Sequence, residues 1–339
     1  MSIYAIPAQA AGFVSLMGRI EKGLGDTLNL PEGLINIGGN GQGYVLESKT
    51  NWDPVDSANN DGTITELSVG DDVYVYAVQD DSGVAKMLAS YNSTYPDGHD
   101  DTSSRKTGGF HYGRVRDLAD AYDSAAGTTE QIIPNSVWDL QHRPKCDPTG
   151  MVEVIPDQVW VDIYLASADG ANWPETKTLS EYDAIPLSGD DGYAYYDYRR
   201  LVRNAGKRML TLDEVLAMAY GVPQGATNAG ARINTGQHTD YGFDCVSCLG
   251  ADQPSGNLRQ LLKDNLFDRD TTNAWADEQN VGKDELENHG QINHADASCA
   301  IFGGGWDHTD EAGARCLRLG SSPWNVHSIT GLRAACDAL

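Results

Sequence analysis

The stretch from Gly221 to Leu339 restricts the choice of fold more than any other part of this chain, because it is long and has little periodic apolar pattern. It is rich in Gly, Asn and Asp. Within this stretch, apolar residues have helical spacing at Asn257–Leu266, where we expect a short helix. A long, poorly periodic segment needs a small regular scaffold beneath it, and this arrangement is typical of binding folds.

That scaffold is expected just upstream. The segments SVWDL (136–140) and VWVDIYLAS (159–167) alternate as half-buried strands do, and we expect them to open a C-terminal domain. Apolar residues at helical spacing predict helices over Tyr198–Asn204 and Leu212–Tyr220, the second with Thr211 as its N-cap and acidic residues in its first turn. The C-terminal part is therefore expected to be α+β.

The N-terminal part is expected to consist of strands. Short apolar runs alternate with turn residues over Leu30–Leu88, and DDVYVYAV, QDDSG and VAKMLAS predict a hairpin with an acidic turn. The polar stretches 95–105 and 117–130 predict a loop and a connection, with a domain boundary near Ala125. The expected division is a β-rich region at 1–45, a β-sandwich-like domain at 46–125 and the α+β domain at 126–339.

Composition narrows the classes of partner. The chain has 339 residues, with 49 acidic and 24 basic side chains and a formal net charge of −25, so it would repel a phosphate backbone and nucleic acid is not an expected partner. We expect neither a signal peptide nor membrane insertion. Six cysteines are too few for a disulfide framework, and synthesis in a reducing cytosol fits them.

Two patterns resemble metal sites only in part. Residues 57–64 resemble the middle of a calcium loop, but Ser57 and Ser68 stand where charged ligands are needed, so a turn is the better interpretation. Cys245 and Cys248 have the spacing of half a zinc site with no second half, which favours a local disulfide or two packed thiols. Three histidines could converge: His294, His308 and His327. We expect no metal and no cofactor, although calcium binding stays open.

No catalytic motif stands out in the sequence. Composition does not rule out a Ser/His/Asp or Cys/His triad, but GxSxG, GxxxxGK[ST] and a GxGxxG motif in strand and helix context are missing. We therefore expect a protein that is not an enzyme, with no catalytic residues.

Four pieces in order resemble the C-type lectin fold in the form shared by formylglycine-generating enzymes and the variable proteins of diversity-generating retroelements. They are NAGKRMLTLDEVLAMA (204–219), SGNLRQLLKD (255–264), FGGGW (302–306) and TGLRAACD (330–337). The family's tryptophans after the Gly-Asn pair are replaced here by Arg259 and Leu261. The resemblance implies a C-type lectin-like C-terminal domain preceded by all-β assembly domains.

From about Thr107 onward, the chain more specifically resembles the phage major tropism determinants. The matching pieces are GGFHYGRVR (108–116), PNSVWDLQHRP (134–144), GMVEV (150–154), VWVDIYLAS, the Cys245/Cys248 pair and the C-terminal motifs. This resemblance implies a homotrimeric receptor-binding protein at the tip of a phage tail fibre, made in the host cytoplasm and carried on the virion. It would bind a host cell-surface receptor, protein or glycan, and other phage tail proteins.

The enzymes of similar fold can be compared with this chain residue by residue. Sulfatase-activating relatives place two reactive cysteines shortly after the GGxW strand, whereas here no cysteine lies between Trp306 and Cys316. Ergothioneine-type iron enzymes need a histidine-rich N-terminal domain, and the first hundred residues contain His99 alone. Two alternatives remain: a structural virion or baseplate protein with a fixed lectin-like decoration domain, and, with less support, a formylglycine-generating-type oxidase.

The resemblance also places the receptor contacts between GGxW and the final Gly-x-Arg. The expected contact residues are Gly305, Asp307, His308, Thr309, Asp310, Glu311, Arg318, Gly320, Ser321, Trp324, Asn325 and His327, with Ile329 at the margin. If 305–311 is extended, its alternate side chains share the solvent side while Trp306 anchors the core. The expected scaffold residues among them are Trp306, Gly313, Arg315, Pro323, Gly331 and Arg333.

Overall fold

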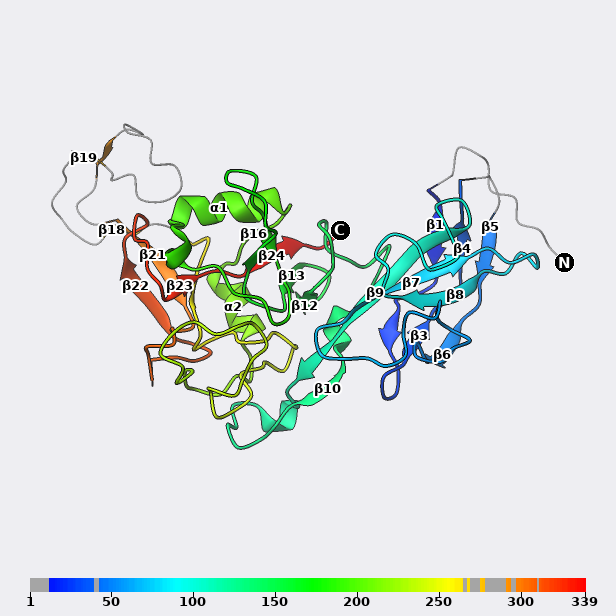
Figure 1. Ribbon diagram of the computed structural model, residues 1–339, viewed down its shortest axis with the longest axis horizontal. Helices are drawn as coiled ribbons and strands as arrows, with labels where there is room; N and C mark the ends of the chain where they lie inside the picture. Colours follow the sequence, from blue (N-terminus) through cyan, green and yellow to red (C-terminus); the bar gives the residue numbers. More distant parts are fainter. Residues whose placement is uncertain are drawn as a thin grey trace. The chain divides into compact units, whose positions relative to one another are not determined.

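The computed structural model in Figure 1 divides the chain into two compact units. It describes residues 12–39, 43–264, 267–268, 275–277, 291–293, 297–309 and 311–339. Unit 1 comprises Met1–Arg114, Glu130–Arg143 and Leu339, and unit 2 comprises Val115–Thr129 and Pro144–Ala338. The division thus differs from the expected one. The regions 1–45 and 46–125 lie mostly in one unit, and the chain passes between units at several points instead of once near Ala125.

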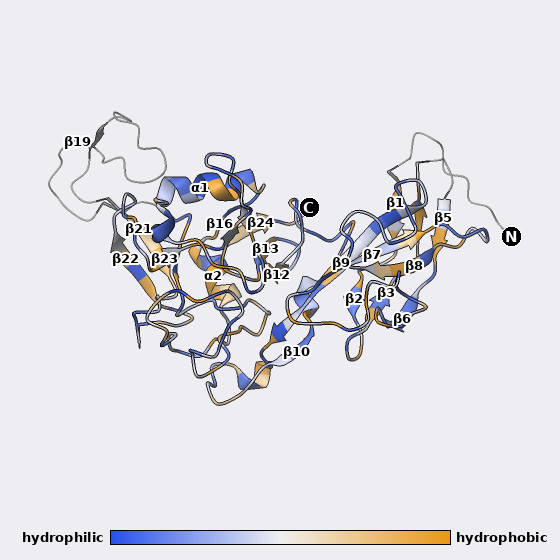
Figure 2. Cartoon of the chain, in the orientation of Figure 1, coloured by the Kyte–Doolittle hydropathy of each residue, from blue (hydrophilic) through white to orange (hydrophobic). Residues whose placement is uncertain are grey.

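Unit 1 is built from short strands in three sheets, with orders β1-β4-β5, β2-β3-β6 and β10-β9-β7-β8, where β11 also pairs with β9. The strands are β1 (Val14–Leu16), β2 (Glu21–Lys22), β3 (Leu28–Leu30), β4 (Gly33–Asn36), β5 (Gly43–Leu46), β6 (Lys49–Trp52), β7 (Asp72–Val78), β8 (Lys86–Ser90), β9 (Ser104–Val115), β10 (Thr129–Ile132) and β11 (Trp138–Asp139). Figure 2 shows apolar residues concentrated in β7 and β8. The predicted hairpin is confirmed by the antiparallel register Tyr74↔Ser90.

The expectation that the segment SVWDL opens the C-terminal domain is wrong. Its strand, β11, belongs to unit 1. Trp138 pairs with Gly109 and Asp139 with Gly108 of β9. A Cβ on Gly108 would lie 2.4 Å from the carbonyl oxygen of Trp138, so the missing side chain lets the two strands approach. Alternation predicted a strand here, but it could not identify the sheet that the strand joins.

In its described residues, unit 2 contains two α-helices and four small sheets, with orders β12-β13-β24-β16, β14-β15, β18-β21-β17-β23 (β22 also pairs with β21) and β19-β20. Its elements are β12 (Met151–Ile155), β13 (Val159–Asp162), β14 (Ser167–Ala168), β15 (Thr178–Leu179), α1 (Tyr195–Asn204), β16 (Arg208–Met209), α2 (Leu212–Met218), β17 (Arg259–Leu261), β18 (Phe267–Asp268), β19 (Trp275–Asp277), β20 (Gln291–Asn293), β21 (Ala297–Phe302), β22 (Leu317–Ser321), β23 (Thr330–Gly331) and β24 (Ala334–Asp337). Short 3-10 turns lie at Leu118–Asp120, Pro134–Ser136 and Gly189–Asp191.

Both predicted helices are present, as α1 and α2. Thr211 accepts from the backbone N–H of Glu214, and the Glu214 carboxylate accepts from the Thr211 N–H, which completes the capping box. The core of unit 2 packs Leu201 and Val202 of α1 against Leu261 and Ile301 of the sheet that holds β17 and β21. In the part of the chain that the structure describes, no helix has the length and apolar character to cross a membrane.

The predicted helix at Asn257–Leu266 is wrong over its described part. Arg259–Leu261 forms β17, which runs parallel to β23 and antiparallel to β21. The apolar spacing that indicated a helix arises because Leu258, Leu261 and Leu262 are all buried between neighbouring strands and loops. A short buried strand and a short buried helix give the same apolar pattern, and here strand pairing decides between them.

Candidate ligand-binding surface

The candidate surface begins where β21 ends in two glycines with left-handed backbone conformations. Gly303 has φ +95° and Gly304 φ +74°. A Cβ would lie 2.8 Å from the Pro254 carbonyl oxygen at Gly303 and 2.7 Å from the Ala312 Cα at Gly304. Both positions therefore require glycine for conformation and for space, and the chain turns away from the sheet into the loop that precedes β22.

Main-chain hydrogen bonds hold this loop in place. Gly303 donates to the Cys316 carbonyl at 3.0 Å, Gly313 donates to the Gly303 carbonyl at 3.3 Å, and Trp306 donates to the Asn257 carbonyl at 2.9 Å. The loop therefore keeps its shape through backbone atoms, while several of its side chains point outward.

The predicted contact residues fall into three groups by exposure. Asp307, Thr309, Glu311, Arg318, Asn325 and His327 are exposed, His308 and Trp324 are half-buried, and Gly305 and Ser321 are buried. Gly320 lies in β22, and Asp310 lies outside the described residues. Ile329 is 2 % exposed and belongs to the scaffold.

The expected alternation over 305–311 is wrong, because the segment turns instead of running extended. Trp306 and Asp307 form a turn, and the Gly305 N–H donates to Nδ1 of His308 at 2.9 Å. A Cβ on Gly305 would lie 3.1 Å from the Cβ of Ile329, so this residue packs inward. The side chains of Asp307, Thr309 and Glu311 are thus exposed because the chain turns here, and not because alternate residues of a strand point to one face.

Most of the residues that were predicted to belong to the scaffold are buried or half-buried. Gly313, Pro323, Gly331 and Arg333 are buried and Trp306 is half-buried, whereas Arg315 is exposed. A Cβ on Gly331 would lie 2.6 Å from the Leu187 carbonyl oxygen, so β23 can pass close to that loop only without a side chain. Arg315 belongs with the surface residues instead.

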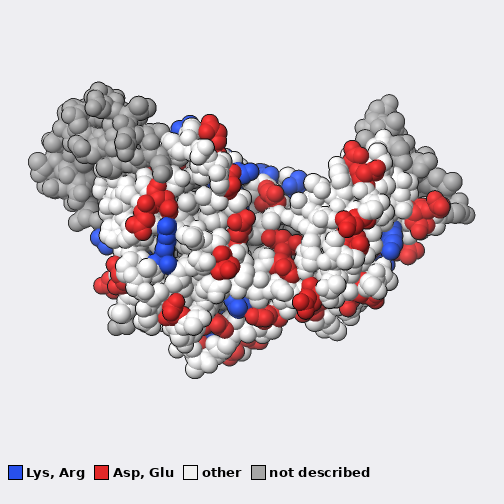
Figure 3. All heavy atoms as spheres, viewed as in Figure 1, with Lys and Arg blue, Asp and Glu red and all other residues white. Residues whose placement is uncertain are grey.

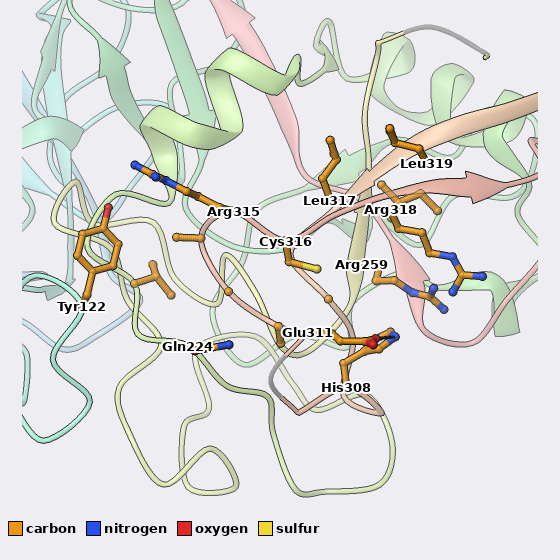
Figure 4. Close-up of a pocket in the computed structure, with 16 residues that line it drawn as sticks. Tyr122, Gln224, Arg259, His308, Glu311, Arg315, Cys316, Leu317, Arg318 and Leu319 are labelled. Atoms are coloured by element: carbon orange, nitrogen blue, oxygen red, sulfur yellow. Dashed lines mark ion pairs between the residues drawn. The ribbon is translucent and has the colours of Figure 1, made fainter. Parts of the chain in front are cut away.

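A pocket of about 1200 Å³ lies between this loop and β22 (Figure 4). Predicted contact residues line it in part, namely His308, Glu311 and Arg318. Other lining residues were not predicted as contact residues from the sequence, among them Tyr122, Gln224, Arg259, Arg315, Leu317 and Leu319. Leu317 is 38 % exposed and Leu319 is 45 % exposed. The alternation of these leucines with Arg318 is the pattern of a strand, and it could have predicted β22 from the sequence.

Two aromatic side chains form a second feature of the surface. The rings of Trp324 and Tyr196 lie with centroids 5.0 Å apart and an interplanar angle of 31°. Trp324 Nε1 is buried without a hydrogen-bond partner among the described residues, and Tyr196 is exposed. The pair is an aromatic patch next to the segment that carries Asn325 and His327.

Three thiols of unit 2, those of Cys316, Cys245 and Cys248, are not activated as nucleophiles, because burial raises the pKa of each. The Cys316 thiol therefore stays protonated at neutral pH and is a poor nucleophile. Cys245 and Cys248 are both free thiols. Cys245 Sγ lies 3.3 Å from the Ser255 carbonyl oxygen and Cys248 Sγ lies 3.7 Å from that of Asp117, which fits two packed thiols and not a disulfide.

The other candidate metal ligands do not converge where the structure describes them. The segment 57–64 forms a turn in which the Asn60 amide donates to the carbonyls of Pro54, Val55 and Asp56 at 3.1–3.2 Å. Among described residues, no group of three or more His, Cys, Asp or Glu side chains is placed to hold a metal ion. His294 lies outside these residues.

The fold identifies the class to which the chain is similar. All of the chain aligns with solved structures of the major tropism determinant, with a TM-score of 0.68: 22 % identity and 86 % of that chain covered for the P3c variant, and 23 % and 86 % for the U1 variant. The chain therefore has the fold of the tropism determinants, with a mostly β content.

Sequence comparison points to the same family. Residues 24–139 match the family model described as "Mtd second domain". The chain is 28 % identical over 301 residues to the tail fiber receptor-binding protein of Bordetella phage BPP-1, covering 82 % of this chain and 74 % of that protein. The resemblance to the major tropism determinants is thereby confirmed.

Proposed function

We propose that this protein is a phage tail-fibre-tip adhesin that binds a host cell-surface receptor and so determines host tropism. The observation that carries the proposal is one set of exposed residues: Asp307, Thr309, Glu311, Arg318, Asn325 and His327. The first three stand on a loop that glycines and backbone hydrogen bonds hold in shape, Arg318 lies in β22, and the last two lie in the segment that follows β22. Loops of mixed polar side chains on a rigid scaffold suit selective binding. The relative from phage BPP-1, named as a receptor-binding protein of the tail fibre, supports this function.

The two units have different roles in this proposal. Unit 2 is the C-type lectin-like receptor-binding domain, and the all-β unit 1 serves trimer assembly and attachment to other phage tail proteins. A homotrimer at the tail tip would raise the overall strength of individually weak contacts by avidity. The protein acts without catalysis and without a cofactor. Acidic side chains spread over the visible face (Figure 3) do not favour nucleic acid as the ligand.

The test is binding of purified protein to a panel of bacterial strains before and after the candidate surface is changed. Scrambling 307–311 and 318–328 should abolish binding to any strain that the natural protein binds, because these segments hold the exposed side chains. A matched control scrambles the exposed turn Asp80–Ser82 of unit 1 and should bind normally. Unchanged binding by the scrambled surface would contradict the proposal and favour a structural virion protein.

Two further measurements test the finer parts of the proposal. Size-exclusion light scattering should give a trimer, and a stable monomer would contradict the avidity argument. The proposal also takes the candidate surface to be a variable one, diversified by a retroelement. The coding locus should then contain a reverse transcriptase gene and a near-copy of the last coding segment that differs at adenines. An invariant C-terminus in related phages would contradict diversification.

A further inference from the structure

The side chain of Arg259 is buried and lines the 1200 Å³ pocket, and two of its guanidinium nitrogens have no hydrogen-bond partner among the described residues. Arg259 is 4 % exposed, and its Nε and Nη1 atoms are enclosed with no hydrogen-bond partner in the described part of the chain. An enclosed guanidinium that lacks acceptors loses its hydration without compensation. Such an arrangement is unfavourable for the empty protein and needs an explanation.

The strand geometry directs Arg259 toward the pocket. Its backbone is fixed by parallel pairing with Thr330, and its N–H donates to the Ile329 carbonyl at 2.8 Å. Its neighbour Gln260 donates to the Pro254 carbonyl at 2.6 Å and accepts from Arg333 at 3.2 Å. Since successive side chains of a strand point to opposite faces, Gln260 belongs to the scaffold face and Arg259 to the pocket face.

A second guanidinium lies near the first. Arg318 of β22 lines the same pocket, and Figure 4 shows its side chain beside that of Arg259. Burial, and then the positive charge of Arg318, lower the pKa of Arg259. The two like charges repel each other, so an anion bound between them would be favourable.

The neighbouring carboxylates interact with a different side chain. Glu311 Oε2 lies 3.6 Å from Nε2 of His308, and Asp307 Oδ1 lies 3.1 Å from Nδ1 of the same ring. Both carboxylates act on Arg259 through their charge, but no hydrogen bond joins either of them to it. Among the described residues the two enclosed nitrogens of Arg259 therefore have no acceptor, and the side chain that carries them lines the pocket.

We propose that Arg259 and Arg318 form a binding site for an oxyanion, a carboxylate or a phosphate group, carried by the ligand of this protein. Guanidinium groups bind both oxyanions through short, charge-assisted hydrogen bonds, and enclosure strengthens these bonds relative to water. The part of the ligand around the oxyanion would contact the exposed leucines of β22. In taking that ligand to be the host receptor, the inference rests on the proposed function.

The oxyanion site can be tested without cells. The thermal unfolding midpoint of the full chain is measured in sodium phosphate, sodium acetate and sodium chloride at matched ionic strength and pH. A ligand that binds only the folded state raises the midpoint, so phosphate or acetate should raise it above the value in chloride. A shift in phosphate alone would assign a phosphate group, and one in acetate a carboxylate. Equal midpoints in all three salts would overturn the site.

Variants then assign the site to its residues. Arg259→Met should abolish the anion-dependent shift and raise the midpoint in chloride, because it removes an unpaired buried charge. Arg259→Lys keeps the charge but not the planar donor set, and calorimetry should give at least about tenfold weaker anion binding. Arg203→Gln removes an exposed cation of α1 that does not line this pocket, and it should leave the shift unchanged. An anion-dependent shift that persists in Arg259→Met would overturn the assignment.

Cell binding separates this inference from the proposed function. If the natural protein binds no bacterial strain but shows the anion-dependent shift, the adhesin proposal fails and the oxyanion site stands. If it binds cells and shows no such shift, the site fails and the adhesin proposal stands.

Discussion

Arg333 Nε donates a hydrogen bond to Oε1 of Gln260 at 3.2 Å, deep beneath the candidate surface. The same guanidinium donates to the carbonyls of Asp162, Ile163 and Asp252, and its side chain is fully enclosed. One side chain thereby joins β17, the end of β13 and the loop before β17. The C-terminal Gly-x-Arg motif is thus a structural clamp for the sheets that carry the loops.

Replacing Arg333 by Met should destabilise the protein by roughly 3 kcal/mol or more, because several buried carbonyls would lose their donor at once. Urea unfolding followed by tryptophan fluorescence measures the loss. Arg315→Met is the matched control, since Arg315 is exposed, and it should change stability little. Equal losses in the two variants would contradict the clamp.

Lys207 and Asp162 form a second buried contact, with Nζ 2.5 Å from Oδ1. Lys207→Met should cost about 3–5 kcal/mol, because it leaves an uncompensated buried carboxylate. The double variant Lys207→Met with Asp162→Asn should recover part of that loss, since the charge itself is then removed. Chemical unfolding of the single and double variants gives the comparison, and a double variant less stable than the single one would count against the pair.

The turn at the end of β21 should not tolerate a side chain. Gly304→Ala places a Cβ 2.7 Å from the Ala312 Cα at a positive φ, so we expect a loss of about 1–3 kcal/mol and a displaced loop. Gly230→Ala is the matched control, because Gly230 also has a positive φ, +70°, but open space around its Cβ position. If Gly230→Ala lowers the free energy of unfolding as much as Gly304→Ala or more, the positive φ, and not the close approach to Ala312, explains the need for glycine at the turn.

Stability in acid should depend on Arg208. This residue donates to Glu214 at 2.7 and 2.8 Å and to Asp337 at 2.8 and 2.9 Å. Burial opposes ionisation of Glu214, but the hydrogen bonds from Arg208 and Thr211, together with the charge of Arg208, outweigh it and lower the pKa of Glu214 below its ordinary 4.5. The Arg208 hydrogen bonds also lower the pKa of Asp337 below 3.8.

Since these folded-state pKa values lie below the unfolded ones, the stabilisation is present above about pH 4.5 and is lost as pH falls through the folded values. Arg208→Met should be less stable at neutral pH and should lose less further stability in acid. Glu214 should account for most of the effect, because solvent screens the more exposed Asp337. Unfolding curves at a series of pH values test this, and parallel pH profiles would contradict it.

The stacked pair of Trp324 and Tyr196 should matter for binding more than for folding. Trp324→Ala should weaken binding to a susceptible strain by about 30-fold, the effect of a strong aromatic contact. Its unfolding free energy should change far less than that of a core substitution. Leu24→Ala, at an exposed apolar residue of unit 1, is the control and should leave cell binding unchanged. Normal binding by Trp324→Ala would exclude this patch from the interface.

Features with a local cause could be predicted from the sequence. The capping box of Thr211 and Glu214 marks α2, and the acidic turn after Val78 marks the hairpin of β7 and β8. The GGxW and Gly-x-Arg motifs correctly indicated buried backbone and a buried arginine. The helix cap and the hairpin depend on residues close together in the chain, whereas the burial of Arg333 depends on distant partners and was indicated by the family resemblance.

Features that depend on distant pairing could not be predicted. The strand at Arg259–Leu261 exists because β21 and β23 flank it, and β11 joins unit 1 because Gly108 and Gly109 make room for it. The enclosure of Arg259 likewise requires β17, β22 and the loop before β22 to meet. None of these encounters leaves a periodic pattern in the local sequence.

In the loop between Gly304 and Cys316, different residues determine the backbone path and the exposed chemical groups. Its path is set by glycines and main-chain hydrogen bonds, while Asp307, Thr309 and Glu311 project outward. Exchanging these three residues should therefore be nearly neutral for folding, whatever it does to recognition. Selection can then act on affinity alone, so a lineage of such proteins can move from one target to another without passing through unstable intermediates.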